Sequence, residues 1–149
     1  MAPPELLNRP RAILVPVDGS HASLQAVALA CEYGRKHKSK LYAVHVIEVK
    51  RTLPLDAEIE AEETQGDDIL SQAERVAKDS GYSIEGEILH AREAGPAIVD
   101  DAIERGVQLI VMGMAYPQRF GEFELGRVVQ YVLRSAPCEV WVCRHEPQE

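Results

Sequence analysis

The stretch AILVPVDGS, residues 12–20, decides the fold of this chain. The apolar run of residues 12–17 predicts a short buried strand, and Asp18-Gly19-Ser20 predicts a turn directly after it. From residue 20 to residue 36 apolar side chains recur at helical spacing, and basic residues gather near the end of that segment. A buried strand that leads through a turn into a helix is typical of an α/β protein.

The rest of the chain repeats this alternation. Strands are expected over residues 41–49, 82–90, 108–112 and 139–144, and helices over residues 57–80, 95–106 and 126–135. The sequence allows a break or a kink in the second helix at Gly66, and the inner face of that helix is expected to be Ile59, Ile69, Leu70, Ala73, Val76 and Ala77. The order β-α-β-α-β-α-β-α-β predicts a doubly wound α/β fold, in which helices cover both faces of a parallel sheet.

Composition favours one domain over residues 11–145, with a disordered lead-in at residues 1–10 and a tail at residues 146–149. The net charge of -8 argues against nucleic acid or an anionic membrane as the main partner. No apolar run reaches the roughly 20 residues of a membrane span. Three cysteines without CxxC spacing, and no signal-peptide core, predict reduced thiols and a cytoplasmic protein.

Ligands of such sheets bind at the carboxyl ends of the strands, where the strand order reverses. Two segments are expected there: Asp18-Gly19-Ser20, and the loop GMAYPQRFGEFELGR at residues 113–127. A glycine loop between a strand and a helix is typical of a phosphate cradle. This loop also carries aromatic and acidic residues that a phosphate does not favour, namely Tyr116, Phe120, Glu122, Phe123 and Glu124.

Four segments together resemble the universal stress protein family over residues 13–144: ILVPVDGS, LYAVHVIE, AGPAIVDDAIERGVQLIVMG and GRVVQYVLRSAPCEVWVCR. The resemblance implies a five-stranded parallel sheet in the order 3-2-1-4-5. It also implies a homodimer, often formed by antiparallel pairing of the last strands, which here carry Val140, Trp141 and Val142. Many members bind ATP through G-x-x-G, nine residues and then G-[ST], whereas others lack this motif and do not bind ATP.

The ATP motif of the family is matched only in part. Gly113 and Gly126 stand at its first and third glycines, but Tyr116 replaces the second glycine and Arg127 replaces the Ser/Thr. Glycine admits a phosphate close to backbone N–H groups, whereas Tyr116 brings a bulky ring and Pro117 lacks an N–H. Arg127 at a helix N-terminus partly offsets the acidic residues of the loop. The motif therefore implies a degenerate ATP site.

The resemblance also implies a candidate nucleotide pocket. Its residues are Pro16, Val17, Asp18, Val46, Met112, Gly113, Gly126, Arg127 and Val128. Asp18 matches the family aspartate that lies against the nucleoside, but an aspartate also serves as a turn residue or as a helix N-cap without any ligand. The apolar candidates are equally compatible with plain strand core.

Catalysis and metal binding are not expected. Asp18, Ser20 and His21 are neighbours on one turn, and such neighbours seldom reach the geometry of a catalytic triad. His45 and His90 fall on strands that should be adjacent and could approach one another, but no Cys, Asp or Glu stands at ligand spacing. We therefore expect no catalytic residue, no metal and no cofactor, with ATP or AMP as the alternative.

Two surfaces are candidates for contacts. Tyr116, Phe120 and Phe123 either fold inward over a vacant pocket or form a recognition surface. The last strand, with Val140, Trp141 and Val142, is expected to pair with a second copy, because an uncovered edge strand invites pairing.

The sequence thus predicts a homodimeric, non-enzymatic module for stress-linked regulation or protein interaction, with a regulatory protein partner and impaired ATP binding. The alternative is an ATP- or AMP-binding protein.

Overall fold

The structure, a computed structural model, describes residues 9–57, 59–115 and 126–145. The described strands form one parallel sheet in the order β3-β2-β1-β4-β5, which confirms the predicted fold class and strand order. Helices alternate with the strands along the chain. The elements are β1 (Ala12–Pro16), α1 (His21–His37), β2 (Lys40–Glu48), α2 (Glu60–Asp79), β3 (Glu85–Ala91), α3 (Ala94–Arg105), β4 (Leu109–Ala115), α4 (Arg127–Ser135) and β5 (Glu139–His145).

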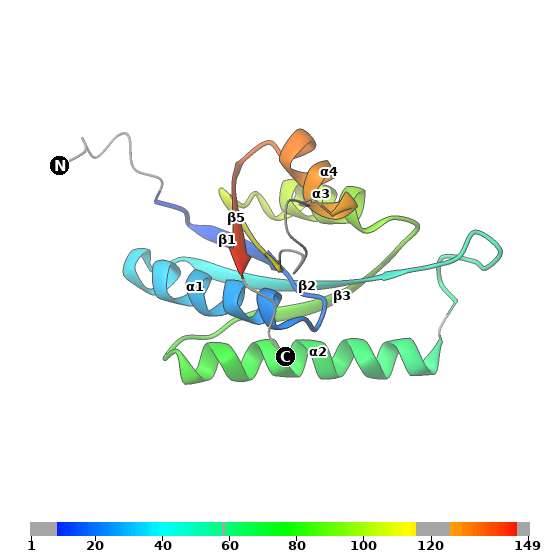
Figure 1. Ribbon diagram of the computed structural model, residues 1–149, viewed down its shortest axis with the longest axis horizontal. Helices are drawn as coiled ribbons and strands as arrows, with labels where there is room; N and C mark the ends of the chain where they lie inside the picture. The colour runs from blue at the N-terminus through cyan, green and yellow to red at the C-terminus, as the bar shows by residue number, and fades with distance from the viewer. Residues whose placement is uncertain (1–8, 58, 116–125, 146–149) are drawn as a thin grey trace, which may run out of the picture.

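Helices cover both faces of the sheet. Helices α1 and α2 lie on one face, and α3 and α4 lie on the other (Figure 1). Along β1 the side chains alternate between the two cores, since Ile13 and Val15 face α1 while Leu14 faces α3. Every helix follows a parallel strand, so the helices begin together at the carboxyl edge of the sheet. No helix in the described ranges is long and apolar enough to cross a membrane.

Three expected boundaries are wrong by three residues. The fourth strand continues to Ala115 rather than ending at residue 112. The second helix begins at Glu60 rather than at residue 57, and Ile59 is its N-cap, 37% exposed, rather than part of the inner face. A turn precedes this helix, closed by the hydrogen bond from Ala57 N to Pro54 O at 3.0 Å. The third strand begins at residue 85 rather than 82, because Tyr82 instead packs against the α1 side of the core and donates its hydroxyl to a backbone carbonyl.

Helix α2 runs without a break through Gly66, so the break that the sequence allowed at this residue does not occur. Gly66 is buried against the sheet, where a Cβ would lie 2.9 Å from Ile88 Cδ1 and 3.1 Å from His45 Cδ2. The missing side chain therefore lets α2 lie close to β2 and β3. The expectations for Tyr116, Phe120 and Phe123, and for most of the lead-in and the tail, fall outside the described residues.

Candidate functional site

The candidate site lies at the carboxyl edge of the sheet, between β1 and β4. These strands pair at Ile13↔Leu109 and Leu14↔Ile110, whereas the pairing of β1 with β2 continues to Pro16↔Val44. The chain leaves β1 into α1 on one face of the sheet and leaves β4 towards α4 on the other. This is the switch point at which α/β sheets bind ligands.

A pocket of about 150 Å³ occupies this crevice. It is lined by many of the residues that the sequence predicted: Pro16, Val17, Asp18, Val46, Met112, Gly113 and Val128. Gly126 and Arg127 are not part of its lining; both are exposed at the start of α4. Tyr116, the other substituted motif position, lies outside the described residues.

Sequence reasoning missed part of the lining, namely Ser23, Val44, His45, Ala94, Ile98 and Val129. These residues come from α1, β2, α3 and α4. Each of them belongs to a helix or strand pattern in the sequence, and no local signal in these patterns indicates that they lie near β1. Five of the six, all but Ser23, nevertheless stand in segments that carry the family resemblance.

Asp18 sits in a turn that its own hydrogen bonds stabilise. Its Oδ1 accepts the N–H of Ser20 at 2.9 Å, and its backbone N donates to Ser23 Oγ at 3.4 Å. Burial of part of the carboxyl acts to raise the pKa of Asp18, but hydrogen bonds from Ser20 and Ser23 together outweigh burial and hold the pKa below its usual value. Asp18 is therefore an ionised acceptor at the pocket, and the N-cap of α1 is Ser20 instead.

His45 reaches from β2 to the end of β1. Its Nδ1 lies 2.9 Å from the backbone oxygen of Val17. The strand register places His45 opposite Ile88 rather than opposite His90, and the His90 ring instead pairs with Glu63 of α2. The two histidines therefore do not form a joint site.

The two glycines of the motif differ in their surroundings. A Cβ on Gly113 would lie 2.0 Å from the carbonyl oxygen of Ala22, so this glycine lets β4 pass the first turn of α1. At Gly126 a Cβ would meet nothing within 4 Å among the described residues. Gly113 thus has a packing role inside the chain, whereas the space at Gly126 is open.

Two helix N-termini flank the pocket, and their backbone N–H groups have different partners. At α3 the backbone N–H of Ala94 donates to Glu48 Oε2 at 2.8 Å, so a carboxylate of the chain already occupies that helix end. At α4 the N-cap is Gly126, which makes no side-chain capping bond, and Arg127 follows with its positive charge. An anion is therefore favoured at α4 rather than at α3.

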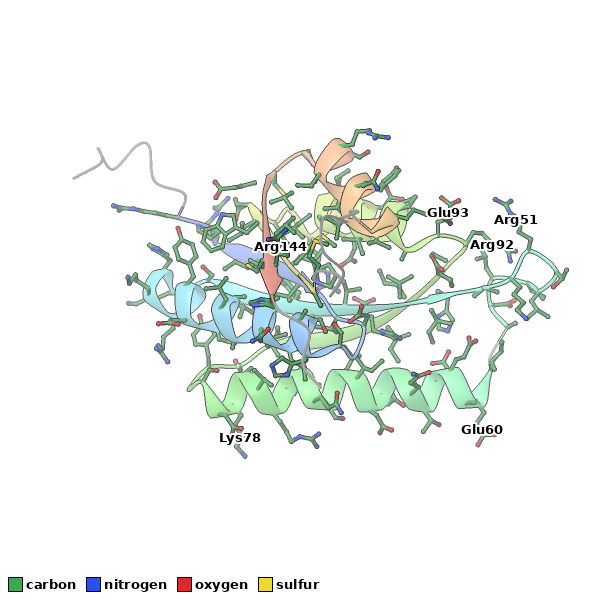
Figure 2. The ribbon with its side chains drawn as sticks, in the orientation of Figure 1. Arg51, Glu60, Lys78, Arg92, Glu93 and Arg144 are labelled. Atoms are coloured by element: carbon green, nitrogen blue, oxygen red, sulfur yellow. The ribbon has the colours of Figure 1, made fainter. Side chains whose placement is uncertain are left out.

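A basic side chain orders the loop that follows β2. The Arg92 guanidinium donates to the Leu53 carbonyl at 2.7 Å and also to the carbonyls of Val49 and Lys50. Figure 2 shows Arg51, Arg92 and Glu93 at the end of the molecule where α2 begins, far from Lys78 at the other end of that helix. Arg92 thus fixes the loop after β2 at the carboxyl edge.

The other candidate groups have structural roles. Ser20 Oγ accepts the N–H of Ser23 as the cap of α1, at 3.1 Å. Burial raises the pKa of the Cys31 thiol to about 11, so little thiolate is present at neutral pH. The described ranges hold no group of three or more His, Cys, Asp or Glu that could bind a metal.

A model of the universal stress protein family matches residues 10–144. The chain belongs to this family. It is 29% identical over 148 residues to a universal stress protein of Methanocaldococcus jannaschii, covering 95% of this chain and 86% of that protein.

Solved structures of universal stress proteins share the fold. One from Archaeoglobus fulgidus is 25% identical with a TM-score of 0.71, over 88% of this chain and 91% of that one. A structure of the universal stress protein from Archaeoglobus fulgidus in complex with dAMP has a TM-score of 0.70 at 24% identity, over 88% of this chain and 95% of that one.

Proposed function

We propose that this chain is a non-enzymatic, stress-linked regulatory or protein-interaction module of the cytoplasm. Its pocket accepts the nucleoside part of an adenine nucleotide, and its binding of ATP is impaired. The observation that carries the proposal is the ionised Asp18 carboxylate beside a largely apolar pocket at the switch point of the sheet. The free thiols of Cys31, Cys138 and Cys143 suit a reducing compartment.

The chemistry of Asp18 favours an aminopurine. An ionised carboxylate only accepts hydrogen bonds, so it prefers a ligand that presents an N–H group. Adenine has a donor in its 6-amino group, whereas a 6-oxopurine would bring a carbonyl oxygen to that position and carries its donor at N1 instead. Apolar walls from Val17, Val46 and Met112 suit the flat faces of a base. The Archaeoglobus fulgidus relative that was solved with dAMP supports this ligand class.

The motif positions favour a short phosphate chain. Tyr116 and Arg127 replace residues that members of the family use to hold ATP, and Glu122 and Glu124 add negative charge to the same loop. The N-terminus of α4, with Gly126 and Arg127, still suits one phosphate group. AMP therefore fits the site better than ATP does.

Titration calorimetry with AMP and with Mg-ATP tests this function. We expect AMP to bind and Mg-ATP to bind with a dissociation constant weaker than about 1 μM, which corresponds to roughly 8 kcal/mol. Tyr116→Gly combined with Arg127→Ser should raise the affinity for ATP, because it restores the motif. Binding of Mg-ATP at about 1 μM or tighter would contradict the impaired site, and a lack of AMP binding at about 1 mM would contradict the nucleoside pocket.

A further inference from the structure

The peptide unit that joins Val17 to Asp18 leaves the sheet at the pocket. The N–H of Val17 still pairs with the Val44 carbonyl of β2 at 2.9 Å, as in a regular parallel ladder. The ladder ends before the Val17 carbonyl, because β1 itself ends at Pro16 and the chain turns towards α1. The next carbonyl and the next N–H must therefore find other partners.

Two side chains supply these partners. His45 Nδ1 lies 2.9 Å from the Val17 carbonyl oxygen, and Ser23 Oγ accepts the Asp18 N–H at 3.4 Å. A carbonyl oxygen only accepts hydrogen bonds, so Nδ1 of His45 carries the hydrogen. The orientation of this one peptide plane, from which the Asp18 side chain projects, is thus set by a residue of β2 and a residue of α1.

The His45 ring has little freedom. It stands on β2 against α2, where a Cβ on Gly66 would approach its Cδ2 to 3.1 Å. Because Gly66 has no side chain, the ring fits between the helix and the end of β1. His45 also lines the pocket, so this contact joins α2 to the wall of the site.

We propose that His45 is a positioning residue that directs the Asp18 carboxylate at the amino group of the bound purine. The His45 N–H holds the Val17 carbonyl, and the held peptide plane fixes where the Asp18 side chain points. The inference rests on the proposed nucleoside pocket, and it assigns the base preference of that pocket to a residue outside the turn that carries Asp18.

The preference for AMP over IMP measures the position of Asp18, since AMP places its donor at the 6-amino group, whereas IMP has an oxo group there and carries its donor at N1 instead. We expect the wild-type protein to prefer AMP by about tenfold, as for one hydrogen bond to a charged group. His45→Phe keeps the ring and removes the donor, so the preference should fall to within about twofold. In His45→Asn the amide nitrogen takes the place of Nδ1, so most of the preference should return. His90→Phe is the control, because His90 is an exposed histidine of the next strand that does not line the pocket.

The outcomes separate the inference from the proposed function. A wild-type protein that does not bind AMP overturns the proposed function and the inference with it, whereas one that binds AMP and IMP equally overturns the inference alone. A folded His45→Phe protein that keeps the tenfold preference overturns the inference alone. Loss of the preference in both His45 variants also overturns the inference, because the donor would then not be the decisive feature.

A spectroscopic measurement tests the hydrogen bond from His45 to Val17 even if His45→Phe does not fold. Nitrogen NMR of the wild-type protein reports which ring nitrogen of His45 carries the hydrogen. We expect the Nδ1–H form for His45. The Nε2–H form would overturn the inference, because that tautomer cannot donate to the Val17 carbonyl.

Discussion

Gly113 and Gly126 share one motif, but the structure gives them different neighbours. At Gly113 the backbone carbonyl of Ala22 occupies the space that a Cβ would need. A backbone atom in the first turn of α1 cannot rotate away as a side chain can, so any larger residue must displace the helix from β4. Gly126 has a negative φ of -61° and open space among the described residues, so an L-residue fits there without strain.

Gly113→Ala should therefore destabilise the protein by about 3 kcal/mol or more, because its methyl group overlaps a fixed backbone. Gly126→Ala is the matched control and should change the free energy of unfolding by no more than about 1 kcal/mol. Urea denaturation followed by circular dichroism measures both. Equal stabilities for the two variants would show that the close approach of β4 to α1 is not a constraint.

Helix α2 shows how tertiary packing overrides local propensity. Glycine is the least favourable residue in a helix interior apart from proline, so Gly66 alone suggested a break. The helix continues because its buried side packs on the core through Ile69, Leu70, Ala73 and Ala77. Gly66 contributes by letting that side approach Ile88 and His45.

Gly66→Ala should consequently destabilise the protein by about 1 kcal/mol, opposite in sign to the gain of about 1 kcal/mol that helix propensity predicts. In an Ile88→Val background the Cδ1 that a new Cβ would meet is absent, so the same change should cost less. A double-mutant cycle from urea melts measures this coupling. A stabilising Gly66→Ala in the wild-type background would contradict the close packing of α2 on the sheet.

The sheet has two edge strands, and they differ in the side chains that they expose. β3 forms one edge and exposes charged and polar side chains, Glu85, Glu87 and His90, which disfavour pairing. β5 forms the other edge with the half-buried run of residues 140–143. Trp141 packs edge-on against Tyr33 of α1 at 4.7 Å between ring centroids, while Val140 and Val142 face α4. We propose that two copies pair through the outer backbone of β5.

Proline at Val140 or at Val142 should then shift the protein from dimer to monomer in sedimentation velocity experiments. Proline lacks the N–H that a ladder needs and obstructs the approach of a second strand. Val140→Ala and Val142→Ala keep the backbone N–H and should remain dimeric. If both proline variants are folded and fully dimeric, the interface lies on another surface.

Much of the architecture was already determined by the sequence, because it depends on local periodicity. The alternation of apolar strands with amphipathic helices predicted the parallel sheet. The position of Asp18 after the first strand and of Gly113 near the end of the fourth predicted their place at the switch point. The boundaries at residues 57 and 82 were wrong, because a turn closed by Ala57 N precedes the second helix and Tyr82 packs on the core before the third strand, so both elements begin three residues later than predicted.

Only the tertiary structure decided which residues complete the pocket and how Asp18 is held. His45, Ala94 and Ile98 are far from β1 in the sequence, and nothing in a local pattern states which backbone carbonyl a histidine reaches. The same holds for Gly66 and Gly113, whose roles are set by atoms of Ile88 and Ala22 on other elements. The physical reason is that side-chain periodicity is imposed by the chain's own backbone, whereas these contacts arise where separate elements meet.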